Sequence, residues 1–275
     1  METFEWKWKS RDGLELAARS WKPENPKAVV VLIHGHGEHI NRYQHVADAL
    51  TEAGYAMLAF DLRGHGQSAG PRGHTPDYDT LMNDISDFIA DANKRFTGLP
   101  VFLYGHSMGG NQVVNFALRS PGSLKGLVVT GPWLKLAFDP SAFQLLLAKS
   151  LNNIVPSFSL SSGLDQNALS RDPKVISKYA SDPLVHDKIS VRLYTSIYGN
   201  GLWALEHAGQ LKIPMLLMHG SADKLTSAQA SQEFALRAGQ IVTLRIWDGL
   251  YHEIHNEPEK TEVIQTIIDW LDQHN

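Results

Sequence analysis

One serine of this chain lies in the pattern Gly-x-Ser-x-Gly, at residues 105–109. It follows the apolar, strand-like run 101–104 and precedes the helix-like run 111–118. A turn this sharp strains the serine backbone, and side chains two residues to either side would collide, which explains the glycines. Such a strand–turn–helix context presents a serine hydroxyl for attack on a carbonyl carbon. The sequence therefore predicts that Ser107 is a nucleophile.

A serine nucleophile needs a base to take its proton and an acid to orient that base. Asp223 follows the apolar run 213–220, and His252 lies in the loop after the strand-like run 241–247. Parallel strands bring the loops at their carboxyl ends to one edge of the sheet. We therefore predict Ser107 as the nucleophile, His252 as the general base and then acid, and Asp223 as the residue that orients the imidazole.

Two other residues compete for these roles. Asp248 is a rival acid, but it precedes His252 by only four residues and is poorly placed to reach the far ring nitrogen. His255 is a rival base, three residues further on, and is expected to begin the approach to the last helix. Asp223 by itself could be a turn former or a helix cap. The joint order of the three residues behind three strand ends favours the triad.

Acyl chemistry also needs donors for the negative oxygen that develops at the carbonyl. One is expected to be the backbone N–H of Met108, just after the nucleophile and at a helix N-terminus, where the helix dipole favours negative charge. The other should come from the loop 34–39, which follows the apolar run 29–33. Glycines on both sides of His36 leave its amide exposed to a ligand. We therefore predict an oxyanion hole formed by the amides of His36 and Met108.

The same loop also resembles a metal-ligand cluster. Its order His34-x-His36-x-Glu38-His39 is close in spacing to the histidine-rich loop of metallo-β-lactamase-type hydrolases. No other His/Asp cluster in the chain has ligand spacing, and a complete Ser/Asp/His set is present. A metal-dependent hydrolase is therefore the weaker alternative, and we expect no metal and no organic cofactor.

The elements that must position these residues alternate along most of the chain. Two antiparallel strands are expected first, at 3–9 and 14–21. The later alternation of strands and helices predicts an α/β fold, with a mostly parallel central sheet and helices on both faces. The later strands are expected at 28–34, 55–60, 100–105, 124–130, 213–219 and 241–247. The helices are expected at 42–53, 78–95, 107–119, 227–238 and 259–273.

Residues 133–205 interrupt this alternation and predict a mostly helical cap over the serine, inserted between the core segments 1–132 and 206–275. Four apolar side chains of the cap fall at helical spacing: Phe143, Leu146, Leu147 and Leu151. They could form an acyl-chain channel and a lip that contacts lipid surfaces, or they could pack on the core below. The sequence does not separate these alternatives, so transient contact with a membrane surface through the cap stays an open expectation.

Composition excludes several classes of function. The 275 residues are 43% hydrophobic, enough for one large core, and the net charge of −4 without a basic stripe argues against a nucleic-acid partner. The absence of cysteine excludes thiol catalysis and is compatible with a reducing compartment. Residues 1–9 lack the apolar core of a signal peptide, and no apolar run is long enough to span a membrane. We expect a cytoplasmic location, peripheral to a membrane if the cap contacts lipid; the oligomeric state stays open.

Taken in order along the chain, six segments resemble motifs of the α/β-hydrolase superfamily, within it the monoacylglycerol lipase and lysophospholipase group of serine aminopeptidase S33-type hydrolases. These segments are HGHGEHINRY at 34–43, DLRGHGQS at 61–68, GHSMGG at 105–110, SDPL at 181–184, HGSAD at 219–223 and GLYH at 249–252. They span nearly the whole chain. The resemblance implies an α/β-hydrolase fold with a cap, and hydrolysis of a small lipid ester, a monoacylglycerol or a lysophospholipid, through an acyl-serine.

The resemblance also implies a site for the glycerol head group. In such lipases it is held by polar side chains that match Glu38, Arg42 and His255 here, and Tyr179 is expected to line the same pocket. Alternatively, Glu38 and Arg42 only pair with each other. The chain has His36 where the animal enzymes have alanine, which puts the acyl pocket in doubt but not the backbone donor. A general carboxylesterase, a thioesterase, a peptidase similar to proline iminopeptidase and a non-catalytic receptor remain alternatives.

Overall fold

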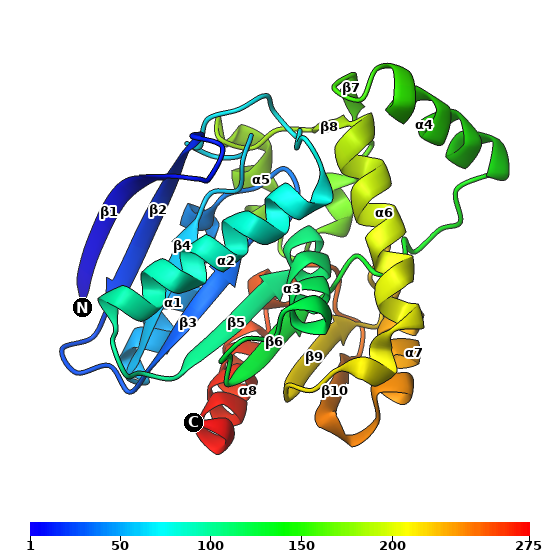
Figure 1. The fold of residues 1–275 in the computed structure, drawn as a ribbon. Coiled ribbons are helices and arrows are strands. Elements are labelled where there is room, and N and C mark those ends of the chain that lie inside the picture. The colour runs from blue at the N-terminus through cyan, green and yellow to red at the C-terminus, as the bar shows by residue number, and fades with distance from the viewer.

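An eight-stranded sheet forms the centre of the computed structural model, which describes residues 1–275 (Figure 1). In spatial order its strands are β1 (Glu2–Lys9), β2 (Glu15–Lys22), β4 (Tyr55–Phe60), β3 (Ala28–Ile33), β5 (Val101–His106), β6 (Gly126–Thr130), β9 (Met215–Gly220) and β10 (Val242–Trp247). Strand β2 runs antiparallel to β1 and β4, and all the other neighbours are parallel. The predicted α/β-hydrolase class is confirmed.

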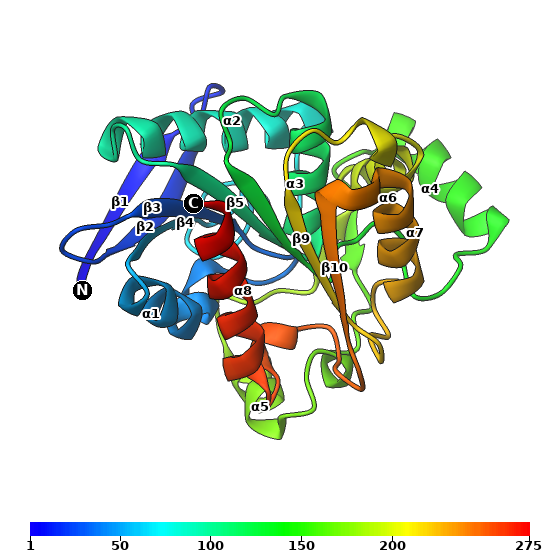
Figure 2. The same cartoon turned by 90° about the horizontal axis from the view of Figure 1, so that it is seen from below.

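Helices cover both faces of this sheet (Figure 2). On one face lie α1 (Gln44–Glu52) and α8 (Lys260–His274), and on the other lie α2 (Tyr78–Arg95), α3 (Met108–Arg119) and α7 (Ala228–Ala238). The central strands are buried along their whole length because each contributes side chains to both layers. Continuous apolar runs, rather than alternating ones, are therefore what these strands require.

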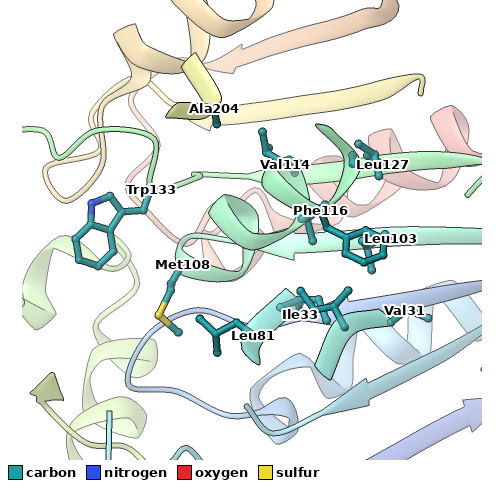
Figure 3. Packing of buried hydrophobic residues seen from close by; sticks show 14 of the residues in the cluster. Val31, Ile33, Leu81, Leu103, Met108, Val114, Phe116, Leu127, Trp133 and Ala204 are labelled. Atoms are coloured by element: carbon teal, nitrogen blue, oxygen red, sulfur yellow. The ribbon is translucent and has the colours of Figure 1, made fainter. Parts of the chain in front are cut away.

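The two faces hold separate hydrophobic cores, of 37 and 26 buried residues. The larger core includes Met108 and Phe116 of α3 together with Ile33 and Leu103 of the sheet (Figure 3). Helix α3 is buried over ten successive residues, Met108 to Ala117, because the sheet lies beneath it and other helices lie around it. The helix that follows the nucleophile is thus buried from its first residue.

The segment predicted to form the cap contains α4 (Ala142–Ile154), β7 (Ser159–Ser161), α5 (Pro173–Ser181), β8 (Lys188–Ser190) and α6 (Val191–Glu206). Strands β7 and β8 form a small antiparallel pair that the sequence patterns do not predict. Helix α6 returns to the core, where Leu193, Ile197 and Ala204 join the same cluster as α3. Short 3₁₀ helices lie at Ile40–Tyr43, Gln166–Ala168, Ala208–Gln210, Gly239–Ile241 and Ile254–Asn256. No helix has both the length and the apolar content that crossing a bilayer requires.

Two parts of the cap differ in burial. We call residues 138–164, which include α4, the outer cap, and residues 165–190, which include α5, the inner cap. No residue of α4 is buried, and Phe143 and Leu146 are 72% and 64% exposed. Leu147 and Leu151 of the same helix instead line a cavity over the serine. The apolar stripe of α4 therefore does not pack on the core.

Candidate active site

The backbone at Ser107 is strained as the sequence predicts. Its φ is 54°, and it is the only residue other than glycine with a positive φ. A Cβ on Gly105 would lie 2.5 Å from the carbonyl oxygen of Gly109, and a Cβ on Gly109 would lie 2.1 Å from that of Ile33. The steric prediction for both flanking glycines is confirmed. The turn between β5 and α3 presents the serine at the carboxyl edge of the sheet.

Ser107, His252 and Asp223 lie in one hydrogen-bonded chain. Ser107 Oγ is 2.9 Å from His252 Nε2, and Nδ1 of the same ring is 2.7 Å from Asp223 Oδ2. The three residues come from the turns and loops that follow β5, β10 and β9. With Asp223 ionised, Nδ1 carries the ring proton, so Nε2 accepts the hydrogen bond from the serine hydroxyl. In this arrangement the imidazole can take the proton of Ser107.

Local electrostatics keep Asp223 charged and His252 basic. Burial alone would raise the pKa of Asp223, but the imidazoles of His252 and His219 hold it well below its usual range. The backbone N–H groups of Leu225 and Thr226 also donate to its Oδ1, at 2.8 and 3.0 Å. Burial would lower the pKa of His252, but the Asp223 carboxylate raises it above its usual value. The acid and base therefore stabilise each other's charged forms.

His219 is a supporting residue that the sequence patterns do not predict. Its Nε2 lies 3.0 Å from Asp223 Oδ2, and its Nδ1 lies 2.8 Å from Ser231 Oγ. Thr226 Oγ1 donates to the same carboxylate oxygen over 2.9 Å. A polar residue at the end of an otherwise apolar strand, four positions before the acid, is the only signal of this contact in the sequence.

The two rival residues lie apart from this chain of hydrogen bonds. Asp248 is exposed and accepts from Ser221 Oγ at 3.1 Å. His255 is fully buried, and neither of its ring nitrogens has a hydrogen-bond partner. Its ring lies against those of His106 and Tyr43, with centroids 4.7 and 4.9 Å apart. The structure therefore joins Asp223, not Asp248, to the imidazole that contacts the serine.

The loop after β3 lies directly against the nucleophile. A Cβ on Gly35 would lie 3.2 Å from the Cβ of Ser107. The backbone N–H of His36 donates to no acceptor within the protein, so it is free for a ligand. Met108 is the first residue of α3, where helical N–H groups have no partner inside the helix. The two predicted oxyanion donors therefore belong to segments that contact the serine, namely the loop after β3 and the first turn of α3.

A cavity of about 430 Å³ opens over Ser107, and half of its 28 lining residues are hydrophobic. Its apolar lining comes mainly from the cap and includes Trp133, Leu136, Leu147, Leu151, Leu160 and Leu164. Its polar lining includes Gly35, Glu38, Tyr179, His252 and Glu253. The lining thus offers apolar side chains to a long apolar group and polar side chains to a small polar group.

The predicted head-group residues divide into two sets. Glu38 and Tyr179 line the cavity over the serine. Arg42 lines a separate polar cavity of about 450 Å³, and His255 lines neither. The Arg42 guanidinium lies 4.8 Å from the centre of the Tyr179 ring. Arg42 therefore does not line the cavity over the serine itself, but contacts Glu38 and Tyr179, which do.

Glu38 and Arg42 are bound to each other and to a carboxylate that the sequence patterns do not predict. Glu38 Oε2 accepts from Arg42 Nη1 at 2.7 Å, as the pairing alternative expects. The same guanidinium makes two 2.7 Å hydrogen bonds to Glu253, the residue after His252. Both carboxylates are only 2% exposed. Burial and the nearby Glu253 raise the pKa of Glu38, while Arg42 lowers that of Glu253.

Two of the three histidines of the loop 34–39 have separate partners, and the ring nitrogens of the third, His36, have none. His34 Nε2 accepts from the N–H of Leu62 at 2.9 Å, and His39 Nε2 lies 2.9 Å from Asp182. No three histidine, aspartate or glutamate side chains of the structure lie in an arrangement that could hold a metal ion. The loop thus contacts the serine through its backbone at Gly35.

Comparison with known proteins gives matches over nearly the whole chain. A family model described as serine aminopeptidase S33 matches residues 24–259. A monoacylglycerol lipase of Mycolicibacterium smegmatis is 35% identical over 95% of this chain and 94% of that protein. An abhydrolase domain-containing protein of Dictyostelium discoideum is 37% identical over 93% of this chain, which spans only 27% of that longer protein.

Solved structures agree. The crystal structure of Paleococcus ferrophilus monoacylglycerol lipase has a TM-score of 0.86 and 36% identity, and each chain covers 100% of the other. The predicted resemblance is confirmed at the level of both sequence and fold. The chain belongs to the serine aminopeptidase S33 family of α/β-hydrolases.

Proposed function

We propose that this protein is a serine ester hydrolase that cleaves monoacylglycerols to fatty acid and glycerol through an acyl-serine intermediate. The observation that carries the proposal is the hydrogen-bonded chain Ser107–His252–Asp223, which opens on a cavity lined by apolar side chains of the cap and by the polar side chains of Glu38 and Tyr179. The names of its relatives, monoacylglycerol lipases among them, support the substrate class. No metal or organic cofactor takes part in this chemistry.

The reaction has two acyl-transfer steps. Ser107 attacks the ester carbonyl while His252 takes its proton, and the amides of His36 and Met108 donate to the oxygen that becomes negative. His252 then gives the proton to the departing glycerol, leaving an acyl group on Ser107. Water activated by the same imidazole releases the fatty acid. Asp223 stabilises the imidazolium in both steps.

The charges of the polar lining residues favour a neutral head group. Glu38 and Glu253 line the cavity, whereas their shared cation, Arg42, lies behind them. Glycerol hydroxyls can donate to Glu38 and reach Tyr179, but a phosphate would meet two carboxylates balanced by one cation. We propose that Glu38 and Tyr179 contact the head group directly. Arg42 and His255 lie behind these residues and support them. Lysophospholipids are therefore the second candidate.

One assay tests the reaction and the substrate class together. Wild-type protein and the variant Ser107→Ala are given 1-monoacylglycerols from octanoyl to oleoyl, lysophosphatidylcholine and p-nitrophenyl butyrate. We expect Ser107-dependent hydrolysis of the monoacylglycerols, with a loss of about 10⁵-fold or more in the variant. Activity on the short ester alone would point to a general carboxylesterase, and near-wild-type activity of Ser107→Ala would overturn the mechanism. Thioester and prolyl-amide substrates complete the panel.

We also propose that the outer cap contacts lipid surfaces transiently. Its exposed apolar side chains include Phe143, Leu146, Ile154 and Phe158, at 72%, 64%, 75% and 49% exposure. Large exposed apolar side chains grouped in one segment are typical of an interaction site. Co-sedimentation with phosphatidylcholine vesicles should be weaker for Phe143→Ser/Leu146→Ser than for wild type, and equal background values would contradict the proposal. A cytoplasmic location, peripheral to the membrane, is proposed with it and is tested by cell fractionation.

A further inference from the structure

Arg42 joins two loops that carry different parts of the serine site. Glu38, in the loop after β3, binds Arg42 Nη1 through Oε2 at 2.7 Å. Glu253, in the loop after β10, binds Nη1 and Nη2 of the same guanidinium, at 2.7 Å each. All three side chains are at least nine-tenths buried. The guanidinium is therefore a bridge between loops that are more than 200 residues apart in sequence.

Each end of this bridge is attached to a backbone that contacts the reaction. Glu38 Oε1 accepts the N–H of Gly35 at 2.7 Å, and Gly35 packs against Ser107 beside the proposed oxyanion donor. Glu253 directly follows His252, and its own N–H donates to the carbonyl oxygen of Leu169 at 2.8 Å. The bonds thus run without a gap from the oxyanion loop to the histidine loop.

Other contacts leave little freedom to the two carboxylates. Tyr43 donates to Glu38 Oε1 at 2.7 Å, and Asn256 Nδ2 donates to Glu253 Oε2 at 2.8 Å. Charge-assisted bonds of this length, buried and bidentate, fix geometry as well as charge. Two carboxylates on one guanidinium also leave a net negative charge beside His252.

We propose that Glu253 is a positioning residue for ester hydrolysis, holding the oxyanion loop in register with His252 through Arg42 and Glu38. The inference rests on the proposed function. The proposed role follows from the geometry of acyl transfer, in which the oxyanion donors and the base must bind different oxygen atoms of one tetrahedral centre at the same time. A loop that shifts by a fraction of an ångström at either end loses that alignment.

The charges around His252 give this role a signature in pH dependence. The groups that face its ring are the carboxylates of Asp223, Glu253 and Glu38, and the neutral ring of His106, whose centroid is 4.9 Å away. All three carboxylates raise the pKa of His252. Removing one of them should therefore move the acid limb of the kcat/KM profile to lower pH, an effect that loss of stability alone does not produce.

The test uses the full chain and p-nitrophenyl butyrate, so that it does not depend on the lipid substrate. Glu253→Gln should lower kcat about 10- to 100-fold, the usual cost of losing a group that orients another, with KM changed less than about threefold, and should shift the acid limb downward. In Glu38→Gln/Glu253→Gln the two losses should not multiply, because both break the same bridge. Multiplying losses, or an unshifted acid limb, would overturn the proposal.

Glu257→Gln is the matched control, because Glu257 is also buried in the histidine loop. It pairs with Arg171 and the N–H of Tyr251, and makes no bond to Arg42. We expect a lower unfolding temperature with an unshifted acid limb, and a shift like that of Glu253→Gln would count against the proposal. Should Glu253→Gln fail to fold, Glu253→Asp, which keeps the charge but not the bidentate reach, must lose kcat without the pH shift. A Ser107→Ala variant that keeps its activity would refute the proposed function instead.

Discussion

The two parts of the cap are built differently. The inner cap is hydrogen-bonded to the catalytic loops: the carbonyls of Ala168 and Leu169 accept from the N–H groups of His252 and Glu253, at 3.4 and 2.8 Å. The outer cap has no buried residue in α4 and exposes its largest apolar side chains. The inner cap is therefore bonded to the loops that carry the catalytic residues, whereas the outer cap only lines and covers the cavity.

The inner cap also contacts the opposite side of the site. The N–H of His186 donates to the carbonyl of Gly37, in the oxyanion loop, at 3.0 Å. In the loop that follows Leu169, Ser170 and Arg171 bind Asn256 and Glu257 of the histidine loop. Movement of the inner cap would displace both the base and the oxyanion donors. We therefore expect any opening of the cavity to involve the outer cap.

Low pH should have the largest effect on stability, because several histidines are buried, of which His36 and His65 lie against His186 of the inner cap. Burial lowers the pKa of His34, His36 and His106 to about 3, and those of His65 and His255 lie well below the usual value. The unfolded chain therefore binds protons below about pH 6.5 that the folded chain does not. Each such residue removes about 1.4 kcal/mol of stability per pH unit below that value. The raised pKa of His252 has the opposite effect on stability, but it is one group against five.

The free energy of unfolding should thus reach its full value above about pH 7. It should fall steeply between about pH 6.5 and 5, by several kcal/mol per pH unit. Denaturant unfolding at a series of pH values measures this slope. A flat profile across that interval would show that these histidines are protonated in the folded state. His186→Gln, in the inner cap next to His36 and His65, should leave most of the slope in place because its own ring is only partly buried.

Substitution of two glycines with similar φ can test the difference between the two parts of the cap. One contacts the inner cap and the other belongs to the outer cap. Gly37 has φ 74°, and a Cβ there would lie 2.5 Å from the carbonyl oxygen of His186. Gly163, in the outer cap, has φ 68°, and a Cβ there would meet nothing within 4 Å. Each alanine substitution costs about 1–2 kcal/mol of backbone strain, but only Gly37→Ala should also lower kcat/KM, by about 100-fold. Similar kcat/KM values of the two variants would show that the inner cap is no more closely coupled to catalysis than the outer cap.

Loss of the Arg171 side chain should have an intermediate effect. Arg171→Met leaves the fully buried Glu257 without its cation, while Arg171 itself is one-third exposed. Breaking a buried pair costs about 3–5 kcal/mol, and solvent screening at the exposed partner reduces this to about 1–2 kcal/mol. Lys149→Met, on the exposed face of α4, is the control and should be neutral. Thermal unfolding of both variants makes the comparison.

The smallest effect is expected in the outer cap. Phe143→Ser/Leu146→Ser removes two exposed side chains, so unfolding free energy should change by less than about 0.5 kcal/mol. Turnover of p-nitrophenyl butyrate should also stay near the wild-type value, since neither side chain lines the cavity. A destabilisation of more than about 1 kcal/mol would mean that α4 is part of the folded core.

Much of the molecule could be predicted because its signals are local. Apolar runs with short loops locate the strands to within about two residues, since a strand buried on both faces must be apolar throughout. The turn at Ser107 is predictable because only glycine fits where Gly105 and Gly109 approach other backbone atoms. Asp223 and His252 follow from their places behind two of these strands.

Contacts between distant segments could not be predicted in the same way. The bond between Arg42 and Glu253 joins residues 211 positions apart, and no local pattern indicates which of two neighbouring carboxylates an arginine will bind. The attachment of the inner cap to the histidine loop uses the carbonyls of Ala168 and Leu169, which every residue type possesses. Sequence alone thus predicted the strands of the central sheet and the three residues that the structure joins in one hydrogen-bonded chain. Only the tertiary structure decided how the loops that carry them are held together, because ion pairs and backbone hydrogen bonds depend on proximity in space.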